Sequence, residues 1–326
     1  MNQAWRFLTF VLLVALALGS RISLAQSYPG KAVRIVVNMT PGGGADFAAR
    51  LIGQKLTEAW KQPVLIDNRG GAGGNIGADA VAKAAPDGYT LLVTPSGLAS
   101  GPGLYRKLPF DPQKDFTPIS QIYSGPLMLV VNAGVPAASA GELIALAKAK
   151  PGSLNYGHNG MDTTLYLTME LFKISAGIDI LAIPYKGSSQ VTTALVAGEV
   201  NAAFMSAESV LPHVKSGKVR ALGVASRARL PVLPTVPTMA EAGIAGDLEL
   251  PNWLGMFAPA GTPRDILELI QREVAKVLSM PEVRDRFIAQ GRVPVASKPA
   301  EFDAKFKADI AQFVRILKEA RVPLQD

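Results

Sequence analysis

The chain contains no cysteine and only two histidines, and each shortage excludes certain covalent links or metal sites. Without thiolates it can form no disulfide, no zinc–cysteine site and no iron–sulfur cluster. His158 and His213 lie 55 positions apart, which is not the local spacing of a metal-binding motif. A metal site would have to depend on carboxylates, and we expect neither a metal nor a cofactor.

Runs of like charge are also missing. The 33 Lys and Arg residues outnumber 26 Asp and Glu, a formal net charge of +7, but no stretch holds five or six basic residues in a row. Aromatic residues make up 7% of the chain and do not alternate with the basic ones. We therefore expect no nucleic-acid partner, although a modest positive field would attract a small anion.

Long apolar runs are absent except at the start of the chain. Phe7 to Leu18 is apolar apart from Thr9, follows Arg6, and precedes the cleavage-like sequence Ser23-Leu24-Ala25. Residues 1–25 are thus predicted to be a signal peptide. Its removal would leave 31 basic and 26 acidic residues, a net charge of +5, in a protein expected to be soluble outside the cytoplasm. Because no cysteine is present near the cleavage site, we expect no lipid anchor.

Beyond residue 28, short β-branched runs alternate with helical patterns, which is typical of a largely parallel sheet flanked by helices. Strands are expected near 33–38, 63–66, 89–94, 127–131, 180–184, 202–205, 221–225 and 253–258, and helices near 46–60, 78–84, 140–149, 165–174, 190–197, 210–215, 264–278, 281–290 and 300–320. The length suggests two domains. Crossings near 124–126 and 252 would give lobe one from 26–124 and 253–326 and lobe two from 125–252, with a cleft between them.

A glycine turn after the first predicted strand is the strongest local signal. Pro41-Gly42-Gly43-Gly44-Ala45-Asp46 separates the apolar run 33–37 from a helical pattern. Consecutive glycines permit positive φ or close approach to the backbone. A helix that starts there directs its unpaired N–H groups and the positive end of its dipole at the turn, which favours anion binding. A tight connection without a ligand is the alternative.

Known nucleotide-binding and catalytic motifs are not met. A dinucleotide fingerprint would need glycine at positions 47 and 76, where Phe47 and Ile76 stand. Neither a P-loop nor a G-x-S-x-G or S-x-x-K motif occurs. We expect no catalytic residue. The alternative from another class is a secreted hydrolase or lyase in which His158 works as a base beside Asp162.

Three further loops follow predicted strands, where ligands bind in open α/β sheets. Ser96 and Gly97 follow the third strand. A polar loop from Asn155 precedes a helix, with Asp162 or Thr163 as the capping residue. Tyr185 and Lys186 follow the next strand, and Lys186 is placed to attract or contact an anion.

Several motifs together resemble a known family. They are Pro41 to Asp46, Asp67-Asn68-Arg69-Gly70-Gly71-Ala72-Gly73-Gly74-Asn75-Ile76-Gly77, Ala85-Pro86-Asp87-Gly88-Tyr89-Thr90-Leu91, Leu104-Tyr105-Arg106-Lys107-Leu108-Pro109-Phe110-Asp111-Pro112, Pro184-Tyr185-Lys186-Gly187 and Phe257-Ala258-Pro259-Ala260-Gly261-Thr262-Pro263. In this order they are similar to the Bug family, the extracytoplasmic solute receptors of tripartite tricarboxylate transporters. They extend over essentially the whole chain after the signal peptide.

The resemblance implies an α/β, two-lobed periplasmic binding protein, type II-like (Venus flytrap), with a discontinuous first domain. Such a receptor closes around a small organic carboxylate and delivers it to membrane permease subunits; we expect a monomer. A receptor that presents its ligand to a sensor kinase is the alternative within this class. Carried over by position, the ligand-binding residues are Gly42, Gly43, Gly44, Ala45, Asp46, His158, Asn159, Gly160, Met161, Asp162, Thr163 and Thr164, with Ser96 and Gly97 lining the same cleft. Tyr185 and Lys186 are added from their position after the next predicted strand.

The chain differs from the family pattern in its second lobe. His158, Met161 and Asp162 stand in a loop where small residues are usual, and Met205 stands where an aspartate often follows phenylalanine. In lobe one, the loop from Ser96 to Gly103 is rich in glycine where a histidine or threonine is common in the family. The identity of the acid therefore stays open.

Overall fold

The computed structural model describes residues 28–161, 163–246, 248–319 and 322–325, and the predicted signal peptide lies outside them. The strands are β1 (Val33–Val37), β2 (Val64–Asn68), β3 (Thr90–Pro95), β4 (Phe116–Ser124), β5 (Leu127–Asn132), β6 (Asn155–His158), β7 (Leu181–Pro184), β8 (Ala202–Ser206), β9 (Val219–Ala225), β10 (Trp253–Pro259) and β11 (Val293–Pro294). The helices are α2 (Gly44–Trp60), α3 (Asn75–Ala82), α4 (Gly97–Leu104), α5 (Ala140–Ala149), α6 (Thr164–Ala176), α7 (Ser188–Ala197), α8 (Ala207–Lys215), α9 (Arg264–Ser279), α10 (Pro281–Ala289) and α11 (Pro299–Glu319), with the 3₁₀ turn η1 (Ala72–Gly74).

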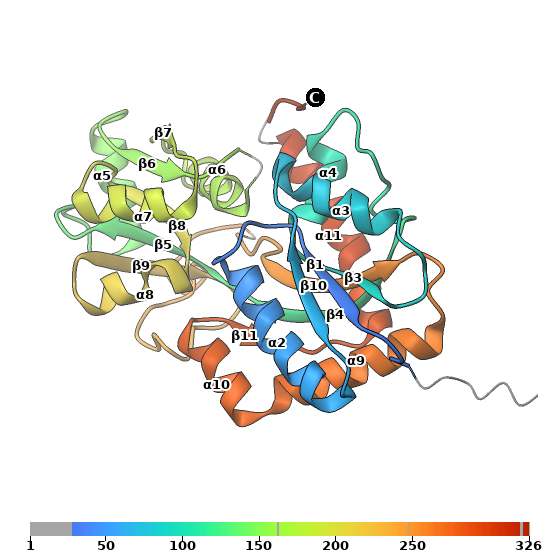
Figure 1. Cartoon of the computed structure of the whole chain (residues 1–326). Coiled ribbons are helices and arrows are strands. Elements are labelled where there is room, and N and C mark those ends of the chain that lie inside the picture. The colour runs from blue at the N-terminus through green and yellow to red at the C-terminus, as the bar shows by residue number, and fades with distance from the viewer. Residues whose placement is uncertain (1–27, 162, 247, 320–321, 326) are drawn as a thin grey trace, which may run out of the picture.

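The strands form two sheets, each the centre of one lobe (Figure 1). The first has the order β11-β4-β10-β3-β1-β2, with β1 parallel to β2 and β3, and β10 antiparallel to β3 and β4. The second has the order β7-β6-β8-β5-β9, with β6 parallel to β7 and β8 and β5 antiparallel to β8 and β9. We call the parts built on these sheets lobe one and lobe two.

Two crossings connect the lobes, and they lie side by side. The first joins β4 to β5 and the second leads from β9 to β10. The Gly125 N–H donates to the Asn252 carbonyl at 2.8 Å, and the Asn252 side-chain amide donates to the Gly125 carbonyl. Strands of lobe one consequently come from both ends of the described chain, with lobe two inserted between them.

Helices cover both faces of each sheet because the strands are apolar on both sides. Along β1, Val33, Ile35 and Val37 join one buried cluster and Val36 joins the cluster on the opposite face. In lobe two, α5 and α6 lie over one face and α7 and α8 over the other. With no disulfide possible, this burial is the main source of stability.

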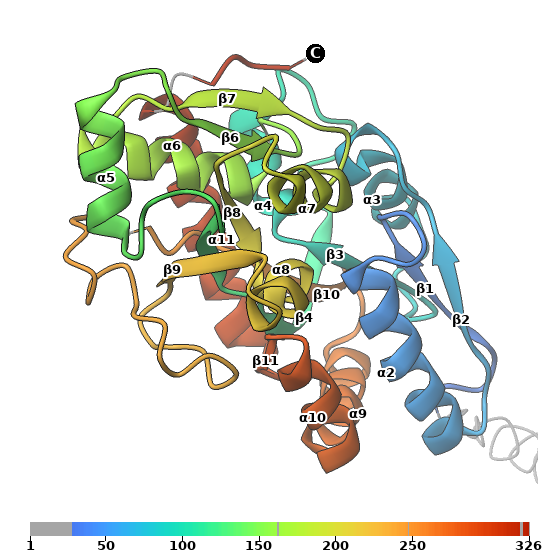
Figure 2. The same cartoon turned by 90° about the vertical axis from the view of Figure 1, so that its left-hand side faces the viewer.

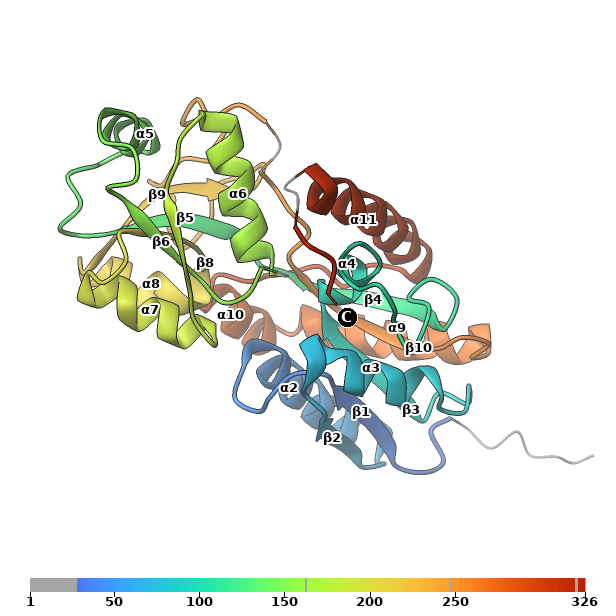
Figure 3. The ribbon, with the colours of Figure 1, turned by 90° about the horizontal axis from the view of Figure 1, so that it is seen from above.

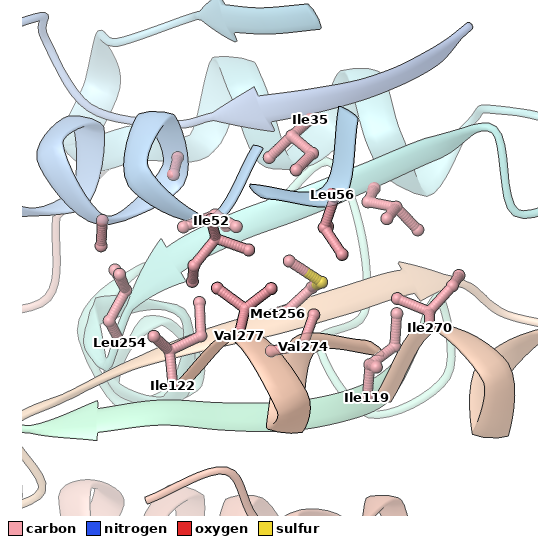
Figure 4. Close-up of a cluster of buried hydrophobic side chains, with 14 of the residues drawn as sticks. Ile35, Ile52, Leu56, Ile119, Ile122, Leu254, Met256, Ile270, Val274 and Val277 are labelled. Carbon is pink, nitrogen blue, oxygen red and sulfur yellow. The ribbon is translucent and has the colours of Figure 1, made fainter. Parts of the chain in front are cut away.

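Figure 4 shows the core between α2, α9 and the first sheet. Ile52 and Leu56 of α2 and Val274 and Val277 of α9 surround Met256 of β10. These helical residues recur at intervals of three and four, the period that places them on one helix face. Both helices are thus fixed to the sheet that positions the glycine turn.

Most sequence predictions of secondary structure are confirmed, with two corrections. The segment 101–119, where no helix or strand was expected, contains the end of α4 and the start of β4. Pro102 and glycines inside α4 hide its helical pattern. The polar segment from Asn155, expected to be a loop, begins as strand β6, whose four residues pair in parallel with β7.

A buried carboxylate ties α11 to the second crossing. Trp253 opens β10, and its indole Nε1 donates to Asp309 Oδ2 at 2.7 Å. Lys305 Nζ lies 3.0 Å from the same oxygen. Burial raises the pKa of Asp309 above its usual value, and the opposing effects of Lys305 and Trp253 are smaller.

This raised pKa predicts a pH-dependent contribution to stability. Between the ordinary aspartate pKa of about 3.9 and the raised pKa, the folded state binds more protons than the unfolded chain. The contribution of Asp309 is therefore complete below the ordinary value and is lost as pH rises through the raised one. We expect the free energy of unfolding of the natural chain, measured against Asp309→Asn by urea denaturation, to fall with rising pH. A difference that is constant or grows with pH would contradict this.

Candidate functional site

The glycine turn connects β1 to α2 as predicted, and the helix begins at Gly44. Gly42 has φ of +84°, a left-handed conformation that favours glycine, and its N–H donates to Asp46 Oδ2 at 3.0 Å. Gly43 caps the helix in extended conformation without any side-chain hydrogen bond. The N–H groups of the first turn of α2 thus have no side-chain cap, and they point into the turn.

Asp46 stabilises the turn from inside the protein. The residue is buried, and its Oδ1 lies 2.9 Å from Arg50 Nε. Burial alone would raise the pKa of Asp46, but hydrogen bonds from Arg50 and the Gly42 N–H outweigh it and hold the pKa below its usual value. The carboxylate therefore stays ionised and paired with Arg50.

The three glycines have three different environments. A Cβ at Gly43 would find no neighbour closer than the Thr40 carbonyl oxygen at 3.8 Å. A Cβ at Gly44 would lie 2.3 Å from Arg292 Nη2 and 3.1 Å from Glu208 Oε1. Gly42 provides the left-handed conformation, Gly43 leaves the backbone accessible, and Gly44 makes room for a charged pair.

The second glycine-rich turn packs against the segment that connects β1 to the first glycine turn. Asn38 directly follows β1, is buried, and donates from Nδ2 to the Gly74 carbonyl at 3.3 Å. A Cβ at Gly74 would lie 2.5 Å from that amide nitrogen, and one at Gly77 would lie 2.6 Å from the Arg69 carbonyl oxygen. Because these two positions are glycine, the Asn38 side chain and the Arg69 backbone can pack closely against them. Sequence reasoning did not assign this packing role to Asn38.

The third strand-end loop joins the hinge to the same edge. Ser96 is buried, and its N–H donates to the Trp253 carbonyl at 3.0 Å. Gly97 begins α4, is exposed, and has open space on its Cβ side. The strand β3 places this loop next to β1, so Gly97 and the glycine turn lie at the same end of neighbouring parallel strands.

In lobe two, His158 ends a strand and is buried, which corrects its expected position in a loop. Its ring lies 4.8 Å from that of Tyr166 and 5.8 Å from that of Tyr156, measured between centroids. The Gly160 N–H donates to His158 Nδ1 at 3.3 Å. The imidazole therefore accepts a hydrogen bond from the backbone of the loop that follows β6.

A hydrogen-bond network shapes the loop that follows. Thr163 Oγ1 lies 2.9 Å from Asn159 Oδ1 and 2.8 Å from the Gly160 carbonyl, and it accepts from the Tyr166 N–H at 3.4 Å. Asn159 Nδ2 donates to Ser188 Oγ at 3.0 Å. Thr163 is thus the N-cap of α6, and Asn159 connects this loop to the start of α7.

The remaining predicted residues of lobe two lie near the starts of α6 and α7. Met161 is exposed, Thr164 is the first residue of α6, and Asp162 lies outside the described residues. The Tyr185 N–H donates to the His158 carbonyl at 2.8 Å. Lys186 is exposed, and its backbone N–H donates to Gln190 Oε1.

Both halves of the candidate site lie at carboxyl ends of parallel strands. In Figures 2 and 3, the segment ahead of α2 lies on the side of lobe one that faces α7 of lobe two. Sequence reasoning missed Arg292 and Glu208, which contact the glycine turn from distant parts of the chain. Within the described ranges, no group of three or more His, Cys, Asp or Glu could hold a metal ion, and no helix could span a membrane.

Two α/β lobes, joined by two adjacent crossings and with helix starts at facing strand ends, define the two-lobed class of periplasmic binding proteins. The chain belongs to the family described as the tripartite tricarboxylate transporter family receptor, whose model matches residues 48–321. The resemblance to Bug proteins is thereby confirmed. Members of this family are solute-binding receptors and not enzymes, so the hydrolase alternative is not retained.

Individual relatives support the assignment over nearly the whole chain. Protein BugT of Bordetella pertussis is 37% identical over 303 residues, which cover 92% of this chain and 93% of BugT. An R. palustris protein solved with adipate has a TM-score of 0.83 at 35% identity, covering 91% of this chain and 100% of that one. MatC from Rhodopseudomonas palustris with bound malate has a TM-score of 0.77 at 32% identity, covering 89% and 100%.

The crowding at Gly44 predicts a difference between neighbouring glycines. Gly44→Ala should destabilise the protein by about 1–3 kcal/mol, the usual cost of overpacking, because its methyl group would collide with the buried Arg292 guanidinium. Gly43→Ala, whose methyl group meets open space, is the matched control and should change stability by less than about 1 kcal/mol. Chemical denaturation of both variants measures this. Equal losses of stability in the two variants would show that packing against Arg292 does not require glycine at position 44.

Proposed function

We propose that this protein captures a small organic carboxylate between its two lobes. The observation that carries the proposal is the start of α2, where backbone N–H groups without a side-chain cap lie beside Gly43, which is open to a ligand. Such N–H groups and the helix dipole favour an anion without any cationic side chain. The adipate and malate bound to the two structural relatives have the same chemistry.

The proposed site joins both lobes. Lobe one contributes 42–46 with Ser96 and Gly97, and lobe two contributes 158–164 with Tyr185 and Lys186. The assignment of strands to two sheets supports the division into 26–124 and 253–326 against 125–252. Rotation about the adjacent crossings would bring the two halves together and exclude water, which strengthens hydrogen bonds to the bound carboxylate.

We further propose where the protein works. The apolar segment before residue 25 supports export and removal of a signal peptide, and the family supports a periplasmic location. There the loaded monomer would deliver the acid to the permease subunits of a tripartite transporter. Lys186, exposed beside the lobe-two loop, would help to attract the anion.

A thermal-shift screen over mono-, di- and tricarboxylates tests the ligand class. At 100 times its dissociation constant, a ligand adds about 2.7 kcal/mol to stability, so at least one acid should raise the melting temperature by several degrees. Isothermal titration calorimetry would then give its affinity. Stabilisation by sugars or amines but by no carboxylic acid would overturn the proposal.

Gly43→Val tests the position of the bound acid. The side chain would occupy the open space beside the α2 start, so ligand-induced stabilisation should be lost while the ligand-free melting temperature stays within a few degrees. Gly141→Val, at an exposed glycine of α5 in lobe two with similar free space, is the matched control and should bind normally. If calorimetry gave both variants the natural affinity, the acid would bind elsewhere.

Thr163→Ala tests the second half of the site. Loss of the hydroxyl removes the N-cap of α6 and its bonds to the preceding loop, which should cost about 1 kcal/mol of stability and weaken acid binding. Thr163→Ser keeps the hydroxyl and should restore most of both. Binding that is equally strong in the Ala variant would separate this loop from the ligand.

A further inference from the structure

A charged pair joins the lobes beside the glycine turn. Arg292 lies between α10 and β11 of lobe one, and Glu208 lies in the first turn of α8 of lobe two. Arg292 Nε donates to Glu208 Oε2, and Arg292 Nη2 forms an ion pair with the same oxygen. The interaction therefore connects surfaces that would separate if the cleft opened on this side.

The arginine is buried and packs against two aromatic rings. Its residue is only 4% exposed, and its guanidinium lies 5.4 Å from the ring centroid of Phe47 and 5.0 Å from that of Tyr123. Its Nη1 is buried without a hydrogen-bond partner in the described part of the chain. A buried guanidinium that loses its carboxylate partner is strongly unfavourable, so the pair favours the arrangement of lobes that keeps Glu208 in contact.

The pair also packs directly against the proposed ligand turn. Gly44 leaves the space that Arg292 Nη2 and Glu208 Oε1 occupy. Next to it, a Cβ at Gly291 would lie 2.4 Å from the Cβ of Ala207, the first residue of α8. The start of α8 is thus fixed against lobe one at the point where α2 begins. Because the two charges cancel, the α2 N-terminus remains available to an external anion.

We propose that Glu208 and Arg292 form an interlobe clasp, a positioning pair that holds α8 against the glycine turn and slows the release of a captured acid. The part about release rests on the proposed function. The part about lobe position does not, since it concerns the protein without ligand.

Lobe position can be measured by electron–electron double resonance between two spin labels. The natural chain has no cysteine, so Lys61→Cys in lobe one and Lys218→Cys in lobe two, both exposed, provide unique labelling sites. In this background, Glu208→Gln with Arg292→Met removes both charges without leaving one buried and unpaired. We expect the distance distribution of the ligand-free protein to broaden toward longer distances. A distribution that superimposes on the parent would overturn the clasp.

The matched control is Arg264→Met with Glu268→Gln, which removes an exposed ion pair within α9. It should leave the distances unchanged. A melting temperature for each variant confirms that it is folded. If the control broadened the distribution equally, the effect would not belong to the clasp.

Stopped-flow kinetics with an acid found in the screen measures release. The clasp predicts a dissociation rate at least about tenfold higher in the Glu208→Gln, Arg292→Met variant, with little change in the association rate, as for other desolvated charge pairs. Slower release would mean that Glu208 competes with the ligand, and a change confined to association would indicate electrostatic steering; either overturns the proposal. Altered lobe distances in a protein that binds no acid would instead support the clasp and contradict the proposed function.

Discussion

The paired crossings between the lobes are the constraint on which the site depends. Gly125 and Asn252 bond to each other through both backbone and side chain, so the two connections act at one point. In the proposed closure, the lobes would therefore rotate about that point. The next residue, Trp253, accepts a hydrogen bond from the Ser96 N–H and donates one to Asp309. Hydrogen bonds of Trp253 consequently connect the second crossing to the start of α4 and to α11.

Lobe one offers an anion mainly backbone dipoles. Its nearby ionised groups are already paired, Asp46 with Arg50 and Arg292 with Glu208. In a site from which water is excluded, N–H groups already oriented by a helix need no reorganisation when the anion arrives. Glycine at three successive positions serves this arrangement through three separate requirements: backbone conformation, ligand access and packing against the charged pair.

The parts of this structure that depend on local sequence could be predicted, and the parts that depend on distant contacts could not. The strand, turn and helix around Gly42 follow from apolar periodicity and glycine conformation within a short segment. His158 was expected in a loop because β6 is only four residues long and polar at both ends, and its pairing with β7 is what makes it a strand. The Glu208–Arg292 pair joins residues 84 positions apart, and no local pattern marks either one. The reason for glycine at 44 could be found only after that pair was seen.

The two halves of the proposed site differ in what they can distinguish. A backbone turn would present the same N–H groups to any carboxylate, so in the proposed site lobe one would select the functional group rather than the molecule. In lobe two, the side chains of Asn159 and Thr163 are engaged in holding the loop between the starts of α6 and α7. In the proposed site, selection among acids would therefore depend on side chains that are free to contact the rest of the ligand, and Met161 and Lys186 are exposed at this edge. If these two side chains contact the ligand, one thioether and one ammonium group would favour an acid with an apolar portion and a further polar or anionic group.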